Sequence, residues 1–252
     1  MSEFRGRPVL VTGGAGFIGS HLVETLLEHG AEVLTVVDSL STGRLSNLAT
    51  VAPRITIERL DLVHEDLAPL LRDGAFDTVF HLAGNAHVTN SVADPRMDLE
   101  KNVLATFRLL EAVRAASPES RVVFTSSATV YGEGASPIME DDPKVPTSPY
   151  GASKLACEHY LRLFASLYGL KTATARLFSV FGPRLRKQVV YDFMCKLHRD
   201  PEQLFLHGDG TQVRDMNHVS NVTDALLIIA REAELQGESY NVASGDQVAI
   251  RD

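Results

Sequence analysis

Short apolar runs alternate with amphipathic stretches along the first half of the chain. Several runs are rich in β-branched residues, which is typical of buried strands, and the stretches between them repeat apolar residues at helical spacing. The predicted strands are 9–12, 32–37, 55–60, 77–84 and 122–127. The predicted helices include 17–27, which closes at Gly30, and 97–115. Strands that alternate with helices in this way predict an α/β fold with a doubly wound parallel sheet.

Three glycines stand three residues apart where the first strand meets the first helix: Gly13, Gly16 and Gly19. Without a Cβ, the backbone can turn sharply and approach a pyrophosphate, and the helix can pack closely on the sheet. Free N–H groups at the helix N-terminus favour an anion there. Because the glycines directly follow the first strand, they predict a dinucleotide-binding turn.

Acidic residues end the next two strands. Asp38 follows the second strand, and Asp61 follows the third. A carboxylate at Asp38 can accept both ribose hydroxyls of an adenosine and repels a 2′-phosphate, so it favours NAD over NADP. Asp61 points to the same edge of the sheet and is a candidate contact for the adenine amino group. We expect the polar stretch 39–47 to cover the adenosine.

Composition narrows the class of partner. The chain has 252 residues, 44% of them apolar, which is enough for one large core or for a core with a smaller lobe. A formal net charge of −8 without a Lys/Arg run argues against nucleic acid or an anionic membrane as the main partner. No apolar run approaches the roughly 20 residues of a membrane span, and no signal-peptide core precedes the first strand. We therefore expect a cytoplasmic protein in which Cys157 and Cys195 are reduced and no metal is bound.

A proline-rich connection, 137–149, leads into a predicted helix over 150–168, in which Tyr150 and Lys154 share one face. A tyrosine titrates near pH 10 and is a poor base at neutrality. A neighbouring ammonium and the positive charge of an oxidised nicotinamide favour the phenolate and lower its pKa. Ser127, at the end of the fifth strand, can hold the substrate oxygen that gains or loses the proton. Downstream of a dinucleotide-binding turn, this set predicts catalysis rather than a surface helix pair.

Together these features resemble the extended short-chain dehydrogenase/reductase family, and within it the nucleotide-sugar epimerases and dehydratases. The resemblance runs in order from Val9 to about Arg251. It rests on the glycine turn, on Asp38 and Asp61-Leu62, on Tyr150-x-x-x-Lys154, and on the segments 81–84, 125–132 and 176–184.

The resemblance implies a role for each matching residue. Residues 1–178 would form an NAD-binding Rossmann domain that also receives 219–245, and 179–218 would form a small substrate-binding region, incomplete and shortened toward the C-terminus. The implied catalytic residues are Ser127, Tyr150 and Lys154. The implied NAD-binding residues are Gly13, Gly16, Phe17, Ile18, Gly19, Asp38, Asp61, Leu62, Leu82, Ala83, Asn102, Tyr150 and Lys154. The implied substrate-binding residues are His87, Ser127, Thr129, Ser179 and Arg214.

Two of these residues, Arg214 and Asn102, stand out. Arg214 lies in the segment 208–215, which resembles the family segment whose arginine clamps the diphosphate of the sugar nucleotide, a task that suits a planar guanidinium. Asn102 interrupts the apolar face of the helix 97–115. It is either a satisfied core amide or a residue that holds active-site backbone in shape. The resemblance also implies a homodimer through the helices 97–115 and 151–168.

The sequence departs from the family pattern in three places. Ser179 stands where the sugar-nucleotide members usually have Asn, and Asn221 stands where an Asp is usual. The sequence ends at Asp252, whereas relatives continue for dozens of residues that help build the nucleotide pocket. Either the substrate is held differently, or this is a shortened version.

We predict an NAD-dependent epimerase that oxidises a nucleotide-activated sugar, at the 4-position, to a keto sugar and reduces it again. A dehydratase or decarboxylase would share the oxidation step. Dehydratases of the family need an Asp-Glu pair after the catalytic Ser/Thr, and the decarboxylases commonly have a Glu at the second place, whereas this chain has Ala128 and Thr129. A non-catalytic NAD-binding protein is the second alternative, against which the intact Ser127, Tyr150 and Lys154 argue.

Overall fold

The computed structural model describes residues 3–133, 137–206 and 208–251, so Asp252 lies outside it. Its main feature is a seven-stranded sheet in the order β3-β2-β1-β4-β5-β6-β9, with every pair of neighbours parallel. The predicted doubly wound parallel sheet is confirmed. Its strands are β1 (Val9–Thr12), β2 (Leu34–Val37), β3 (Thr56–Glu58), β4 (Thr78–His81), β5 (Arg121–Ser127), β6 (Lys171–Leu177) and β9 (Gln236–Val242).

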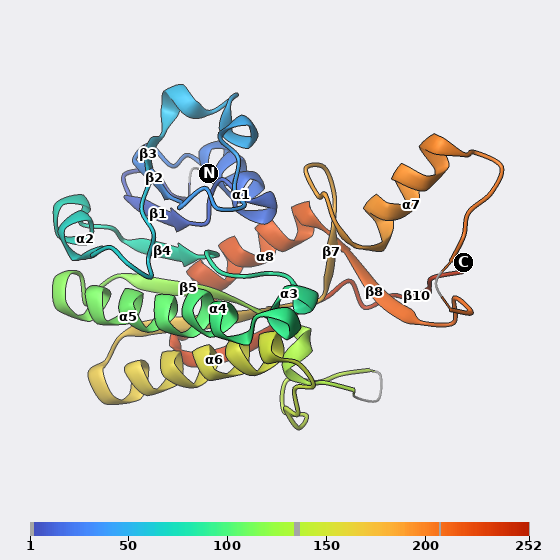
Figure 1. The fold of residues 1–252 in the computed structure, drawn as a ribbon. Coiled ribbons are helices and arrows are strands. Elements are labelled where there is room, and N and C mark those ends of the chain that lie inside the picture. Colours follow the sequence, from blue (N-terminus) through green and yellow to red (C-terminus); the bar gives the residue numbers. More distant parts are fainter. Residues whose placement is uncertain (1–2, 134–136, 207, 252) are drawn as a thin grey trace.

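Helices cover both faces of this sheet (Figure 1). Successive residues of β1 are apolar on both faces of the sheet: Val9 and Val11 pack toward one set of helices, and Leu10 packs toward the other. A strand with apolar side chains on both faces must be covered twice. The helices on the Val9 face are α1 (Phe17–Glu28) and α8 (Val219–Glu232), and those on the Leu10 face are α2 (Ala68–Gly74), α5 (Ala105–Ala116) and α6 (Pro149–Tyr168).

The predicted helix 97–115 is interrupted by a wider turn. It consists of α4 (Pro95–Leu99), a π-helical turn η3 (Glu100–Leu104), and α5. The carboxylate of Asp94 caps the start of α4 by accepting from the Met97 N–H at 3.0 Å. Such π turns recur at functional sites, and this one carries Asn102, whose side chain is buried.

The helix α6 matches its prediction closely. The Ser148 hydroxyl accepts from the Gly151 N–H at 3.1 Å, Pro149 occupies the first turn, and Gly169 ends the helix with φ +71°. These are the usual start and stop signals of a helix. They fix the position of Tyr150 in the first turn and of Lys154 one turn later.

Residues from three parts of the chain form a second sheet that the sequence did not predict. This sheet has the order β10-β8-β7 and consists of β7 (Ser179–Phe181), β8 (Val213–His218) and β10 (Gln247–Ala249). The helix α7 (Gln188–Arg199) joins β7 to β8, and together they form the lobe at the right of Figure 1. The remaining short elements are η1 (Leu45–Leu48), η2 (Ala52–Arg54), α3 (Val88–Ala93) and η4 (Ala128–Val130).

No helix within the described ranges is both long enough and apolar enough to cross a membrane. The same residues contain no group of three or more His, Cys, Asp and Glu side chains placed to hold a metal ion. Cys157 and Cys195 are free thiols.

Candidate active site

A cavity of about 1320 Å³ opens along the carboxyl ends of the parallel strands and continues to the second sheet. In doubly wound folds, ligands bind at this edge of the sheet. All the site residues implied by the sequence line this cavity except Asn102. The lining residues among them are Gly13, Gly16, Phe17, Ile18, Gly19, Asp38, Asp61, Leu62, Leu82, Ala83, His87, Ser127, Thr129, Tyr150, Lys154, Ser179 and Arg214.

The glycine turn is shaped for close backbone contact. A Cβ on Gly13, whose φ is +72°, would lie 2.7 Å from the Ala83 nitrogen, and a Cβ on Gly19 would lie 2.3 Å from the Gly13 carbonyl oxygen. Glycine is therefore required at both positions. Among the described residues, no side chain caps the N-terminus of α1 at Gly16. The first N–H groups of α1 are thus available to an anion, such as a pyrophosphate, in the cavity.

The Asp38 carboxylate is held at the end of β2 by two backbone groups. Its Oδ2 accepts from the Ala15 N–H at 3.0 Å, and its Oδ1 accepts from the Leu40 N–H at 2.8 Å. An ionised carboxylate has about four acceptor sites, so both oxygens can still accept hydroxyl protons. Asp61 is held similarly, with its Oδ1 accepting from the Val63 N–H at 2.9 Å.

Ser127, Tyr150 and Lys154 meet where β5 ends beside the first turns of α6. Ser127 is the last residue of β5, and its Oγ accepts from the Thr129 N–H at 3.3 Å. The Lys154 Nζ donates to the Thr125 carbonyl of the same strand at 3.0 Å. Tyr150 and Lys154 are both nearly fully buried, and all three residues face the cavity.

Burial dominates the charge states of this set in the chain alone. It raises the pKa of Tyr150 to about 12, an effect that the Ser127 hydrogen bond opposes and that the negative charge of Asp98 adds to. Burial also lowers the pKa of Lys154. In the chain alone, desolvation of the phenolate therefore outweighs the neighbouring ammonium. The predicted lowering of the Tyr150 pKa includes the positive charge of a bound nicotinamide and stays a prediction.

Asn102 is the one implied site residue that does not line the cavity. Its Nδ2 donates to Asp98 Oδ1 and to Ser153 Oγ, both at 3.0 Å. A Cβ on Gly84 would lie 2.5 Å from the Asn102 Oδ1, so the amide packs directly behind the cavity wall at Gly84. The π turn thus buries Asn102 behind the cavity wall. This place differs from the predicted direct contact with NAD and fits the alternative of a residue that holds active-site backbone in shape.

The implied substrate contacts come from both sheets. Thr129 Oγ1 is one of six buried side-chain oxygen atoms that lack a hydrogen-bond partner among the described residues. Burial, with a smaller effect of Lys187, lowers the pKa of His87. Arg214 extends from β8 and is exposed, with its Nη1 donating to the Val213 carbonyl at 2.9 Å. A buried polar atom without a partner costs free energy, so Thr129 is suited to a ligand hydroxyl.

The sequence analysis assigned no role to a group of cations that lies in the cavity wall. Arg184, Arg186 and Lys187 lie between β7 and α7 and line the cavity. The signal was present as three basic residues within four positions, the first of which ends the family segment 176–184. In a chain of net charge −8 such a cluster indicates a local site for an anion.

Comparison with known proteins agrees with this geometry. A family model described as NAD dependent epimerase/dehydratase family matches residues 9–243. The UDP-glucose 4-epimerase of Mycolicibacterium smegmatis is 38% identical over 251 residues, which are 96% of this chain and 79% of that protein.

Two solved structures show a similar fold. A UDP-glucuronic acid 4-epimerase from Bacillus cereus, in complex with UDP-glucuronic acid and NAD, has a TM-score of 0.88 and 31% identity, covering 97% of this chain and 80% of that one. The dTDP-glucose 4,6-dehydratase DesIV from Streptomyces venezuelae, with NAD and TYD bound, has a TM-score of 0.88 and 34% identity, covering 97% of this chain and 78% of that one.

Proposed function

The chain belongs to the NAD-dependent epimerase/dehydratase family, in its extended short-chain dehydrogenase/reductase branch, and we propose that it epimerises a nucleotide-activated sugar at C4. One observation carries the proposal. Ser127, Tyr150 and Lys154 line the same cavity as Gly13 and Asp38, so an acid–base set and a dinucleotide cradle face one space.

The cradle fits NAD. The uncapped start of α1, beside the close-packed turn at Gly13 and Gly19, suits the pyrophosphate. The remaining acceptor sites of Asp38 suit the adenosine ribose and oppose a 2′-phosphate. Bound there, NAD would supply a hydride acceptor for C4, and return of the hydride to the opposite face of the keto sugar would give the epimer. We assign the remaining contacts to Phe17, Ile18, Asp61, Leu62, Leu82 and Ala83, which all line the cavity.

The catalytic residues act on the sugar hydroxyl. Tyr150, as its phenolate, takes the proton of the C4 hydroxyl while that carbon becomes a carbonyl, and it returns the proton when the carbonyl is reduced. The Ser127 hydroxyl holds the oxygen during both steps. Lys154 keeps a positive charge beside the phenolate and holds the nicotinamide ribose. Because burial favours the neutral phenol, the positive charges of Lys154 and of the bound nicotinamide are needed to stabilise the phenolate.

The substrate is held from several sides. We assign Arg214 to the diphosphate, Thr129 and His87 to sugar hydroxyls, and Ser179 to the sugar or the diphosphate. The shorter Ser179 hydroxyl reaches less far than the amide usual at this position. Residues 1–178 and 219–245 then form the NAD-binding domain, and 179–218 form the substrate-binding region.

Epimerisation is favoured over the related reactions by the residues after Ser127. A dehydratase or a decarboxylase places an acid there, whereas η4 begins with Ala128 and Thr129, neither of which is acidic. The test is to incubate the NAD-loaded protein with a panel of UDP- and dTDP-sugars and to separate the products. A 4-epimer of at least one sugar is expected, and a 6-deoxy-4-keto product would overturn the assignment.

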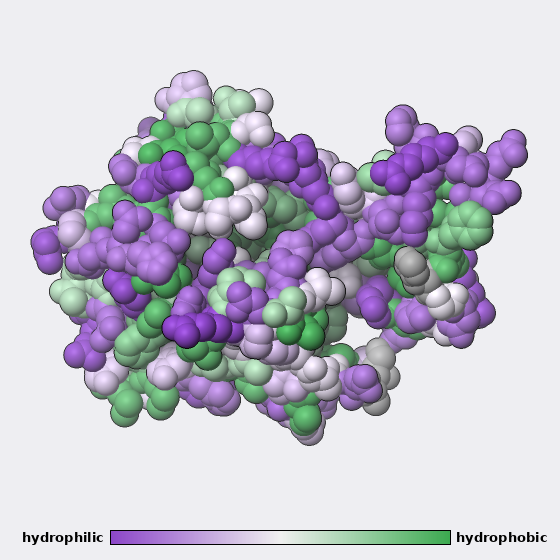
Figure 2. All heavy atoms as spheres, viewed as in Figure 1, coloured by the Kyte–Doolittle hydropathy of each residue, from purple (hydrophilic) through white to green (hydrophobic). Residues whose placement is uncertain are grey.

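We also propose a cytoplasmic homodimer. On α6, Leu163 and Leu167 are 48% and 66% exposed, in line with the half-exposed Tyr160. In the α5–α6 contact, Phe107 packs on Tyr160 and Phe164, whereas Leu163 and Leu167 remain exposed on α6. Figure 2 shows apolar surface along the lower edge where α6 lies. A second copy that pairs the same helices would bury it. Sedimentation should show a dimer at micromolar concentration, and Leu163→Glu should give a monomer; a monomeric unaltered protein would contradict this.

A further inference from the structure

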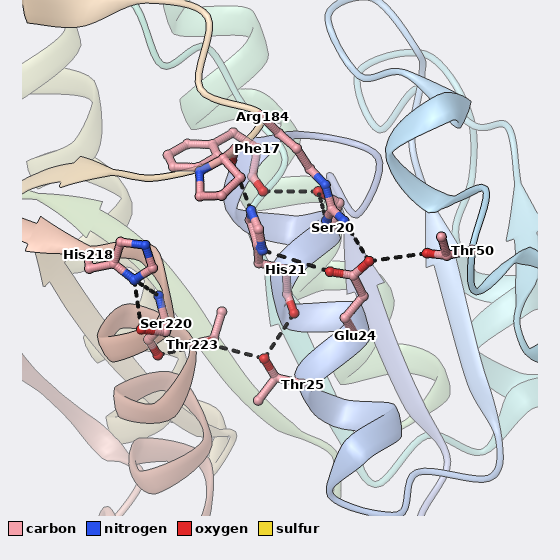
Figure 3. A network of polar contacts seen from close by, with 11 residues as sticks. Phe17, Ser20, His21, Glu24, Thr25, Thr50, Arg184, His218, Ser220 and Thr223 are labelled. Atoms are coloured by element: carbon pink, nitrogen blue, oxygen red, sulfur yellow. Dashed lines mark hydrogen bonds and ion pairs between the residues drawn. The ribbon is translucent and has the colours of Figure 1, made fainter. Parts of the chain in front are cut away.

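Residues 183–188, which we call the strap, connect β7 to α7 along the cavity wall. Its first residues are fastened to α1, as Figure 3 shows. His21 Nε2 donates to the Pro183 carbonyl at 2.9 Å, and Arg184 donates to Ser20 Oγ at 3.1 Å and to Glu24 Oε1 at 2.5 Å. The Arg184 charge is thus neutralised by Glu24. Its role is to fix the start of the strap to the cofactor helix.

Lys187, three residues further on, reaches the opposite wall. Its Nζ donates to the Ala86 carbonyl at 2.7 Å, across 101 residues of sequence. The side chain is half-buried and lines the cavity. No carboxylate in the described part of the chain forms an ion pair with this ammonium, unlike Arg184 or Lys196, each of which has one.

A half-buried ammonium with one carbonyl partner is incompletely solvated. Burial alone lowers the pKa of Lys187, with no acidic residue that restores it. Ammonium groups in such positions gain from an anion that enters the site. In this cavity the anion must come from the ligand.

The position of Lys187 indicates which part of the ligand this is. Ala86 directly precedes His87, which caps α3, and Lys187 lies close enough to His87 to lower its pKa. Further along that helix, Ser91 Oγ accepts from the backbone N–H of Tyr150 at 3.1 Å. Lys187 therefore lines the part of the cavity in which His87 is assigned to the sugar. The sugar must reach Tyr150, whereas the diphosphate lies further along the substrate and is already assigned to Arg214.

We propose that Lys187 binds a carboxylate on the sugar, and that the substrate class is therefore a nucleotide-activated uronic acid. This inference rests on the proposed function, since it takes the sugar to be the group beside Tyr150. His87, whose pKa is lowered by burial and by Lys187, stands beside the same site as a neutral hydrogen-bond donor. The carboxylate accepts a charge-assisted hydrogen bond from the Lys187 ammonium, and this bond replaces water that both groups lose in the cavity.

The test compares two ligands that differ only at C6 of the sugar: UDP-glucuronic acid and UDP-glucose. Their dissociation constants are measured by calorimetry on NAD-loaded protein carrying Tyr150→Phe, so that neither is turned over. Lys187→Met is then added, with Lys187→Arg as the charge-retaining variant. Lys196→Met is the matched control, because Lys196 also donates to a backbone carbonyl, that of Phe205, but does not line the cavity.

Lys187→Met should raise the dissociation constant of UDP-glucuronic acid by roughly tenfold or more, which is the usual effect of losing a hydrogen bond to a charged group. The dissociation constant of UDP-glucose should stay within twofold. Lys187→Arg should restore most of the loss, and Lys196→Met should change neither ligand. Equal weakening of both ligands would place the diphosphate at Lys187 and overturn the inference, as would no weakening of either. If the protein binds neither sugar nucleotide before Lys187 is changed, the proposed function itself fails.

Discussion

The Lys154 ammonium lies 6.0 Å from the centre of the Tyr150 ring, one turn along the same helix. The ammonium is held there by the Thr125 carbonyl at 3.0 Å. Because Thr125 belongs to the strand that ends in Ser127, one strand and one helix fix the three catalytic groups relative to one another. The arrangement is preorganised by secondary structure rather than by a loop.

Tyr150→Phe tests the base directly. The substitution keeps the ring and its packing and removes the ionisable oxygen, so turnover should fall by about 10²- to 10⁴-fold, while the melting temperature and the NAD content stay close to those of the unaltered protein. Tyr160→Phe on the same helix is the control, because Tyr160 packs on Phe107 and does not line the cavity. An unchanged rate in the Tyr150→Phe protein would remove Tyr150 from the mechanism.

The glycine turn allows a comparison at matched backbone geometry. Gly13 and Gly169 have φ values of +72° and +71°, but a Cβ would meet the Ala83 nitrogen at 2.7 Å only at Gly13, with nothing within 4 Å at Gly169. Gly169→Ala should cost roughly 1–2 kcal/mol of unfolding free energy for the left-handed conformation, and Gly13→Ala should cost more, because its Cβ also meets backbone atoms. Only Gly13→Ala should also lose NAD, measured as nicotinamide absorbance after denaturation. Retention of NAD by both variants would contradict the assignment of the glycine turn as the NAD-binding site.

Asp38→Asn tests the preference for NAD over NADP. The amide keeps the shape of the carboxylate, whose oxygens accept from Ala15 and Leu40, but it removes the charge that repels a 2′-phosphate. The ratio of the two dissociation constants should shift toward NADP by roughly tenfold. A ratio that does not move would show that another group selects the cofactor.

Much of this site was predictable because it depends on local spacing. The glycine turn, Asp38 at a strand end, and Tyr150 with Lys154 on one helix face all follow from residues close together in the sequence. The helix α6 was predicted to its end at Tyr168, because Ser148, Pro149 and Gly169 are strong local signals.

The unpredicted parts depend on contacts between distant residues. The strand β6 is buried although it carries Thr172 and Arg176, since Thr172 donates to the Leu161 carbonyl and Arg176 forms a buried ion pair with Glu158 at 2.8 Å. A hydrophobic pattern does not reveal such a strand. The high pKa of Tyr150 and the contact between Lys187 and Ala86 likewise arise only when the chain is folded.

Stability should depend on pH through His81. Burial, and to a smaller extent the Lys154 charge, lowers the pKa of His81 to about 3, whereas in the unfolded chain it is about 6.5. Between these two pKa values, the unfolded chain binds a proton that the folded chain does not. The stability linked to neutral His81 is therefore fully present above about pH 6.5 and is lost as the pH falls toward 3.

The free energy of unfolding should fall by up to about 1.4 kcal/mol per pH unit in this range from His81 alone. Urea unfolding at pH 7 and pH 5 measures the slope. His81→Gln, which can keep one of the hydrogen bonds to Thr12 and Thr106, should be less stable at pH 7 but lose that part of the slope. An identical slope in both proteins would show that His81 is protonated when folded.

The most direct test of the central claim follows the hydrogen on C4 of the sugar. UDP-glucose and UDP-glucuronic acid are each incubated with the NAD-loaded protein in deuterated water, and the products are examined by NMR and mass spectrometry. Oxidation and reduction within one site predict the 4-epimer of at least one of them, with no deuterium bound to carbon. A 6-deoxy-4-keto sugar, or a decarboxylated product, carrying solvent deuterium on carbon would contradict the epimerase mechanism.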